Sequence, residues 1–159
     1  EEIAEGLEAV RPARGRLNWR RAGEIRILDD TYNANPASVR AALDTLGVQK
    51  KGTGRLFVAL GDMLELGPLA DSAHQEVGRQ VAAHGVAEFV GMGPRMRLAV
   101  EKALEAGLGE SHHSESAEAV VALLMKRLAP GDALLVKGSR GMRMERVVDA
   151  LVARLGGGE

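Results

Sequence analysis

The sequence predicts a protein of the α/β class, with helices covering both faces of a mostly parallel β-sheet. Short apolar segments bounded by Gly, Asp or Pro alternate with longer segments whose apolar residues recur at helical spacing. This alternation indicates a Rossmann-like three-layer sandwich, because parallel strands are joined by crossover helices. Aromatic residues make up only 3% of the chain, so the core must consist mainly of Leu, Val, Ala and Met.

The strands are predicted where the apolar runs are short. Buried strands are expected at Glu24–Leu28, Arg55–Leu60, Ala87–Val90 and Asp132–Val136. A weaker polar strand is expected around Glu110–Ser114, and an edge strand at Leu17–Arg20.

The helices are predicted between these strands. Asn35 is expected to cap the first helix, because Asn favours the N-cap position and Pro36 favours the first helical position. The apolar faces of the successive helices consist of Val39, Ala42, Leu43 and Leu46; Ala70, Ala73, Val77 and Val81; Met96, Ala99, Val100, Ala103 and Leu104; Ala117, Val120, Val121 and Leu124; Met144, Val147, Val148, Leu151 and Leu155.

The length of 159 residues fits one domain with short flanking segments. Residues 1–23 are expected to form a connector or hinge that includes a helical stretch at Ile3–Val10, and residues 24–155 the α/β domain. Residues 156–159 are expected to be a frayed tail. The chain starts at Glu1 rather than Met, which suggests a piece of a longer protein.

The composition argues against several classes of partner. The chain has 22 acidic and 21 basic residues, and this near-neutral balance disfavours non-specific binding to nucleic acid. No apolar run is long enough for a transmembrane helix, and no secretory leader is recognisable. The absence of Cys excludes disulfides and makes a cytoplasmic location the default expectation.

Polar loops follow several of the predicted strands. These loops are residues 29–35, 61–67, 91–94 and 137–141. In an open parallel sheet the carboxyl ends of the strands meet at one edge, where ligands collect. The opposite edge contains only plain turns, and this asymmetry predicts a ligand site at the loop-rich edge.

Carboxylates mark two of these loops. The side chains of Asp29 and Asp30 should point to opposite faces of the sheet, so that one can face a ligand hydroxyl or a metal. The other reading is an Asx turn that ends the strand. Asp62 and Glu65 could hold an ammonium group or a metal-bound water, or could simply complement the dipole of a following helix.

The loop at 137–141 has the opposite charge. Lys137 and Arg140 at the start of a helix favour an anion such as a carboxylate or a phosphate, although an ordinary turn is the alternative. Neither a P-loop nor a complete dinucleotide fingerprint is present, so the phosphates of a nucleotide would have to be bound mainly by another domain. Arg16 could swing onto a phosphate from the connector.

The histidines do not predict a metal site. His74 and His84 are ten residues apart, and the adjacent His112 and His113 should point in opposite directions along a strand. His74 is expected to pack in the interior or to touch the acidic loop that precedes its helix.

Three of these segments together resemble the C-terminal domain of the Mur ligases. They run from Asp29 to Ser38 (DDTYNANPAS), from Leu60 to Gly67 (LGDMLELG) and from Val136 to Glu145 (VKGSRGMRME). The resemblance covers essentially the whole chain in order. It is strongest to the branch of the family that joins D-alanyl-D-alanine to UDP-N-acetylmuramoyl-tripeptide.

The resemblance implies a reaction of the complete enzyme. ATP would phosphorylate the tripeptide carboxylate, and the amine of D-alanyl-D-alanine would attack the acyl phosphate to form a peptidoglycan precursor. The N-terminal and central domains of such an enzyme, absent here, would bind most of the UDP-sugar, the ATP and the Mg²⁺. The present chain alone is therefore expected to be inactive. Whether the tripeptide ends in lysine or diaminopimelate stays open.

The resemblance also implies roles for individual residues. Arg16 corresponds to a connector arginine that reaches the γ-phosphate when the domain closes. The residues expected near the nucleotide are Asp30, Asn33 and Asn35. The residues expected to frame the dipeptide are Asp62, Glu65, Lys137, Ser139 and Arg140.

Two other functions compete with this interpretation. A phosphoacceptor signalling module would also use paired Asp and a Lys, but it needs an Asp at the end of the middle strand, where Gly91, Met92 and Gly93 stand. A non-catalytic nucleotide- or peptide-binding α/β module is the second alternative.

Overall fold

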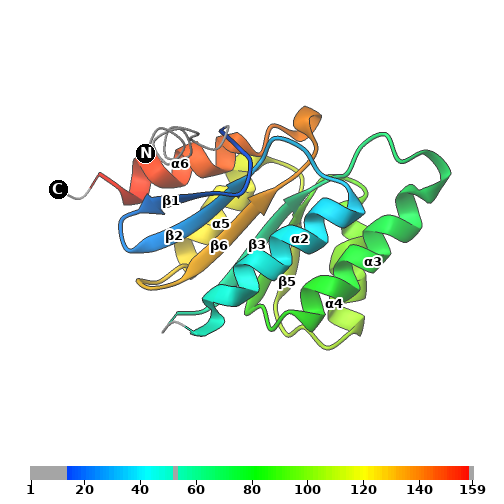
Figure 1. Ribbon diagram of the computed structural model, residues 1–159, viewed down its shortest axis with the longest axis horizontal. Coiled ribbons are helices and arrows are strands. Elements are labelled where there is room, and N and C mark those ends of the chain that lie inside the picture. Colours follow the sequence, from blue (N-terminus) through cyan, green and yellow to red (C-terminus); the bar gives the residue numbers. More distant parts are fainter. Residues whose placement is uncertain (1–13, 52–53, 158–159) are drawn as a thin grey trace, which may run out of the picture.

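The computed structural model describes residues 14–51 and 54–157, which form a three-layer α/β sandwich (Figure 1). Its six-stranded sheet has the order β1-β2-β6-β3-β4-β5. The strands are β1 (Asn18–Ala22), β2 (Ile25–Asp30), β3 (Leu56–Gly61), β4 (Glu88–Met92), β5 (Ser111–Ser114) and β6 (Ala133–Lys137). All neighbouring strands are parallel except β1 and β2, which form an antiparallel hairpin at one edge.

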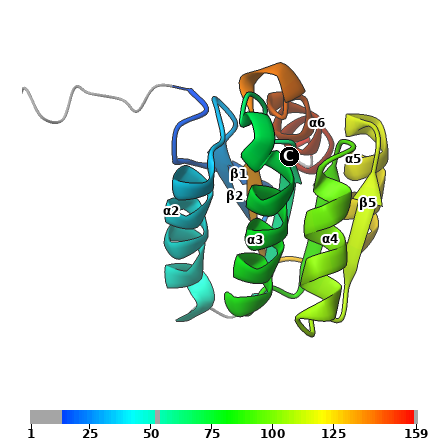
Figure 2. The ribbon, with the colours of Figure 1, turned by 90° about the vertical axis from the view of Figure 1, so that its right-hand side faces the viewer.

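Helices cover both faces of the sheet. They are α2 (Pro36–Gly47), α3 (Ala70–Ala83), α4 (Met96–Glu105), α5 (Ala117–Arg127) and α6 (Glu145–Leu155), with 3₁₀ turns η1 (Val48–Lys51), η2 (Gly67–Leu69) and η3 (Arg140–Met142). Helices α2, α3 and α4 lie side by side on one face, and α5 and α6 pack together on the other (Figure 2). Within the described residues, no helix combines the length and the apolarity needed to cross a membrane.

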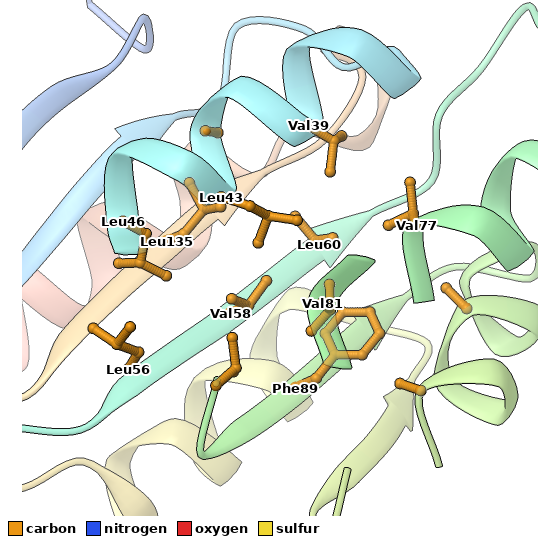
Figure 3. Close-up of a cluster of buried hydrophobic side chains, with 14 of the residues drawn as sticks. Val39, Leu43, Leu46, Leu56, Val58, Leu60, Val77, Val81, Phe89 and Leu135 are labelled. Carbon is orange, nitrogen blue, oxygen red and sulfur yellow. The ribbon is translucent and has the colours of Figure 1, made fainter. Parts of the chain in front are cut away.

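Each face of the sheet has its own hydrophobic core. Figure 3 shows the larger one, in which Val39 and Leu43 of α2 and Val77 of α3 pack on Val58 and Leu60 of β3. The second core lies between the opposite face of the sheet and helices α5 and α6. Strands β3 and β6 are buried along their whole length because helices cover both of their sides.

The predicted elements are confirmed, with boundaries that differ by one or two residues. The polar strand around Glu110–Ser114 is β5, and the edge strand predicted at Leu17–Arg20 is β1. Asn35 caps α2 as predicted, because its side chain accepts a hydrogen bond from the Ser38 N–H while the Ser38 hydroxyl accepts one from the Asn35 N–H. The helix predicted at Ile3–Val10 lies outside the described residues.

Candidate functional site

The loops at the carboxyl ends of β2, β3 and β6 meet along one edge of the sheet, called the rim below. They enclose a cavity of about 510 Å³. The cavity is lined by Tyr32, Asn33, Ala34, Asn35, Leu64, Glu65, Leu66, Ser139, Arg140 and Gly141. The convergence of the four polar loops at one edge is therefore confirmed, since Gly93 also lies against Asp62 of the loop after β3, but only three of the loops line the cavity and Gly91–Pro94 does not.

Asp30 and Lys137 form a buried ion pair beneath the rim. The two residues are register partners at the ends of β2 and β6, and the Lys137 Nζ lies 2.7 Å from the Asp30 Oδ2. Nζ also donates to the carbonyl oxygen of Asn33 at 2.8 Å, and the Leu17 N–H donates to the Asp30 Oδ1 at 3.1 Å. The pair thus ties the loop after β2 and the start of β1 to the centre of the sheet.

Asp30 and Lys137 were predicted to contact different ligands, but in the structure they contact each other. Asp30 was expected near the nucleotide and Lys137 near the dipeptide, yet each side chain satisfies the other. Both still border a smaller cavity of about 200 Å³ beside the first. That cavity is also lined by Arg16, Tyr32, Asn33, Asn35 and Ser38.

Asp29 faces the other side of the sheet, as the alternation predicts. Its carboxylate is fully buried, accepts a hydrogen bond from the Thr31 hydroxyl at 2.7 Å and lies 3.7 Å from Arg20. Asp29 therefore anchors the hairpin on the side of α6 and does not face the rim cavity.

Asp62 caps a helix rather than lining the cavity. Its Oδ1 accepts from the Met96 N–H at 2.8 Å and its Oδ2 from the Arg95 N–H at 3.2 Å, so the carboxylate complements the amino end of α4. A side chain at Gly93 would clash with this carboxylate, because an added Cβ would lie 2.6 Å from it. The predicted contact between Asp62 and a dipeptide has no geometric support in this arrangement.

Glu65 is the acidic residue that does reach the cavity. Its side chain is exposed, and its backbone adopts a left-handed conformation with φ of 62°. Non-glycine residues in this region are strained, and such strain is common at ligand sites. The loop holds Glu65 over the cavity because the neighbouring Leu64 N–H is bound to Ser139.

Ser139 connects the three loops of the rim. Its hydroxyl accepts a hydrogen bond from the Leu64 N–H at 2.8 Å and lies 3.4 Å from the carbonyl oxygen of Ala34. The Ser139 side chain is almost completely buried, so its hydroxyl mainly links the loops to one another.

Arg140 supplies the positive charge of the cavity. Its guanidinium is exposed and makes two hydrogen bonds to the Glu145 carboxylate, at 2.6 and 3.2 Å. Burial by itself would raise the pKa of Glu145, but the hydrogen bonds from Arg140 and from the backbone, with the charge of Arg140, lower it overall. Glu145 therefore stays ionised at neutral pH and keeps Arg140 oriented at the rim.

Arg16 lies against an aromatic ring at the same rim. Its guanidinium carbon is 4.1 Å from the centroid of the Tyr32 ring, within the range of a cation–π interaction. Tyr32 is 47% exposed and borders the cavities on both sides. Tyr32 was not among the predicted site residues, although the single Tyr of the chain, in a loop that also carries two Asn, was the available signal.

His74 supports the acidic loop from below. It is fully buried, its Nε2 accepts from the Met63 N–H at 3.1 Å, and its Nδ1 donates to the carbonyl oxygen of Ala70 at 2.6 Å. Both roles expected from the sequence, packing and contact with the loop, are confirmed. These two partners require the neutral tautomer with the proton on Nδ1.

The fold and the rim define a class of protein: an α/β domain with a polar cavity at the carboxyl edge of its sheet. Comparison with known sequences identifies the family within this class. The family model described as "Mur ligase, glutamate ligase domain" matches residues 15–140. The chain belongs to the Mur ligase family, as a C-terminal domain of the MurF type.

One relative is the UDP-N-acetylmuramoyl-tripeptide–D-alanyl-D-alanine ligase of Mycobacterium tuberculosis. It is 34% identical over 173 residues, which cover 96% of this chain and 34% of that protein. A MurF crystal structure from Acinetobacter baumannii superimposes with a TM-score of 0.80 at 31% identity, covering 96% of this chain and 33% of that one. The chain thus spans about a third of the length of these relatives.

A second solved structure shows the same fold at lower identity. The MurF ligase of Thermotoga maritima, in complex with ADP, matches with a TM-score of 0.77 at 24% identity. The match covers 97% of this chain and 36% of that one.

Proposed function

We propose that this chain is the domain of an ATP-dependent ligase that receives D-alanyl-D-alanine and positions it for attack on an acyl phosphate. The product would be the pentapeptide precursor of peptidoglycan, made in the cytoplasm, where ATP is available. The observation that supports this most strongly is the rim cavity, which places the acidic Glu65 and the basic Arg140 around one space of about 510 Å³.

The charges of the cavity suit a small zwitterionic peptide. The exposed Glu65 carboxylate can accept hydrogen bonds from the ammonium group, and the Arg140 guanidinium can bind the carboxylate at the other end. Leu64 and Leu66 supply apolar lining for methyl side chains. Fixing the dipeptide in this way would contribute to rate by converting a bimolecular encounter into an oriented one.

The nucleotide fits beside the dipeptide. The smaller cavity presents Arg16, Asn33 and Asn35, which offer donors for phosphate or ribose oxygens. The structure of the T. maritima relative was solved with ADP. When bound, ATP would activate the tripeptide carboxylate, and this chain would contribute Arg16 from its connector.

Most of the nucleotide site would lie elsewhere in the complete ligase. Within residues 14–51 and 54–157, no three His, Asp or Glu side chains are grouped as metal ligands. Because the chain also has no P-loop, we place the ligands of Mg²⁺, the UDP-sugar site and most of the ATP site in the other parts of the enzyme. On this proposal the isolated chain binds ATP poorly and does not hydrolyse it.

The test is steady-state kinetics of the complete ligase, measured as dipeptide-dependent phosphate release. Glu65→Gln and Arg140→Met should each raise KM for D-alanyl-D-alanine about tenfold or more, with KM for ATP unchanged, because each removes a charge-assisted hydrogen bond. Arg16→Met should lower kcat instead. Arg79→Met, on the exposed side of α3, is the control and should change neither constant.

Equal changes in both KM values for Glu65→Gln and Arg140→Met would reject the dipeptide site. Phosphate release from ATP by the purified 159-residue chain would reject the division of labour between the domains.

A further inference from the structure

Among residues 14–51 and 54–157, no helix covers Trp19, Arg21 and Arg26 on the side of the β1–β2 hairpin that faces the α2 layer, although Leu28 of β2 lies in the α2 core. Helix α2 packs on β6 and α3, so the edge of the sheet extends beyond it (Figure 1). Ala22 of β1 belongs to the core on the side of α6, and alternation along the strand therefore turns Trp19 and Arg21 toward the uncovered side. Arg26 of β2 lies on the same side, because Ile25 and Ile27 belong to the α6 core.

These side chains form a basic groove, here called the arginine groove. It is a depression of about 290 Å³ lined by Trp19, Arg20, Arg21, Arg26 and Gln49. The guanidinium carbon of Arg26 lies 6.0 Å from the centroid of the Trp19 ring, and Arg26 also donates a hydrogen bond to the Gln49 side chain. The groove therefore combines an exposed aromatic surface with an ordered guanidinium group.

The charges in the groove are not balanced within the described part of the chain. Arg21 and Arg26 are register partners, and like charges directly opposite each other destabilise a sheet. Arg20 forms ion pairs with Asp29 and Asp149 on the other side of the hairpin. The ion pairs among residues 14–51 and 54–157 include neither Arg21 nor Arg26.

We propose that the arginine groove is a docking surface for an acidic segment of a second protein. Carboxylates can bind the two guanidinium groups with paired hydrogen bonds, which removes the repulsion between Arg21 and Arg26. An apolar side chain next to the carboxylates can pack on Trp19. Strand β1 is also the edge strand of the sheet formed by the described residues, so an extended segment can pair with its backbone while presenting alternate side chains to the groove.

The position of the groove separates it from the rim. Arg26 is the register partner of Ala133, the first residue of β6, whereas the rim begins at Lys137, the last residue of that strand. A ligand at the rim therefore lies at the other end of the strands. The groove is thus independent of the proposed ligase function.

A second copy of the chain bound groove to groove would bring two basic surfaces together, which charge repulsion opposes.

The test uses the fluorescence of Trp19, the single tryptophan of the chain. The probe is a short synthetic peptide in which Glu and Leu alternate, titrated into the 159-residue protein at low salt. We expect a saturable change in Trp19 emission that weakens as salt is added. Arg21→Glu and Arg26→Gln should each weaken binding on the order of tenfold, because each removes a charge that faces the peptide.

Three controls make the test decisive. Arg154→Glu makes the same change of net charge as Arg21→Glu on α6, across the sheet, and should leave binding unchanged. A peptide in which Lys and Leu alternate should not bind. Circular dichroism and thermal unfolding check that each variant is folded. Arg21 is exposed, so we expect the Arg21→Glu variant to fold.

The proposal fails on any of four results. These are no saturable binding of the Glu–Leu peptide, equal weakening by Arg154→Glu, tighter binding of oligothymidylate than of the peptide, or self-association that Arg21→Glu abolishes. Failure of the kinetic test at the rim would not affect this result, and the reverse is also true.

Discussion

At the scale of single residues, the Lys137–Asp30 pair is a buried ion pair whose disruption should be costly. Lys137 is 2% exposed and Asp30 is 7% exposed, so both charges have lost most of their hydration. The ammonium group recovers part of this cost through the Asp30 carboxylate and the Asn33 carbonyl oxygen. Removing one partner leaves the other charge buried without compensation.

We expect Lys137→Met and Asp30→Asn each to lower the free energy of unfolding by about 3–5 kcal/mol. The double variant should lose clearly less than the sum of the two, because neither charge is then left alone. Urea unfolding at neutral pH measures all three. Glu76→Gln, which removes one partner of the exposed pair with Arg79, is the matched control and should cost less than about 1 kcal/mol. A cost for Lys137→Met no larger than this control would contradict the interpretation.

At the scale of elements, the contact between α3 and α4 depends on a glycine. An added Cβ at Gly78 of α3 would lie 2.2 Å from the carbonyl oxygen of Ala99 in α4, so the two helix backbones approach too closely for any side chain there. The close approach holds α4 where Asp62 can cap it, and this links the packing of the helices to the loop after β3.

The substitution Gly78→Ala therefore sets two effects against each other. Ala gains about 1 kcal/mol of helix propensity over Gly, but forcing the helices apart costs roughly 1–3 kcal/mol. Because the clash is with backbone that cannot rotate away, we expect net destabilisation, measured as a lower melting temperature. Gly47→Ala at the end of α2 is the control, since its Cβ would make only an ordinary contact with His84 at 3.9 Å. A stabilised Gly78→Ala would show that α3 and α4 can separate freely.

At the scale of the whole molecule, the rim is one connected unit. The Ser139 hydroxyl joins the loops after β2, β3 and β6, and His74 fixes the middle loop from the core. The exposed side chains of Glu65 and Arg140 therefore stand on loops that these buried hydrogen bonds hold in place. Buried hydrogen bonds of this kind position ligand-binding groups more closely than exposed loops can.

We expect Ser139→Ala to loosen the loops of the rim. Loss of the hydroxyl leaves the Leu64 N–H without its acceptor, so amide hydrogen exchange at Leu64 should become faster, with a loss of about 1–3 kcal/mol in local stability. Exchange in the central strand β3 should change much less. Thr45→Ala, which removes an exposed hydroxyl from α2, should leave exchange at Leu64 unaltered. Unchanged exchange at Leu64 in the Ser139 variant would rule out this coupling.

Much of the fold could be predicted from the sequence because its signals are local. The alternation of short apolar runs and helical periodicity located the strands and helices, and Asn35 with Pro36 marked the start of α2. The meeting of polar loops at one edge also followed, since parallel strands bring their carboxyl ends together. Glu65 and Arg140 reach the cavity as expected, because both stand in loops that the strand pattern places at that edge.

The partners of the buried charges were decided only by the tertiary structure. Lys137 is 107 residues from Asp30 in sequence, and the two meet because β6 inserts next to β2 in the sheet. Asp62 turns to the amino end of α4, 34 residues away, because β4, the strand that leads into that helix, is the neighbour of β3 in the sheet. The sequence alone determined which side chains are charged and which edge they occupy. Strand order and helix packing, which depend on contacts between distant segments, decided which charges are bound internally and which line the cavity.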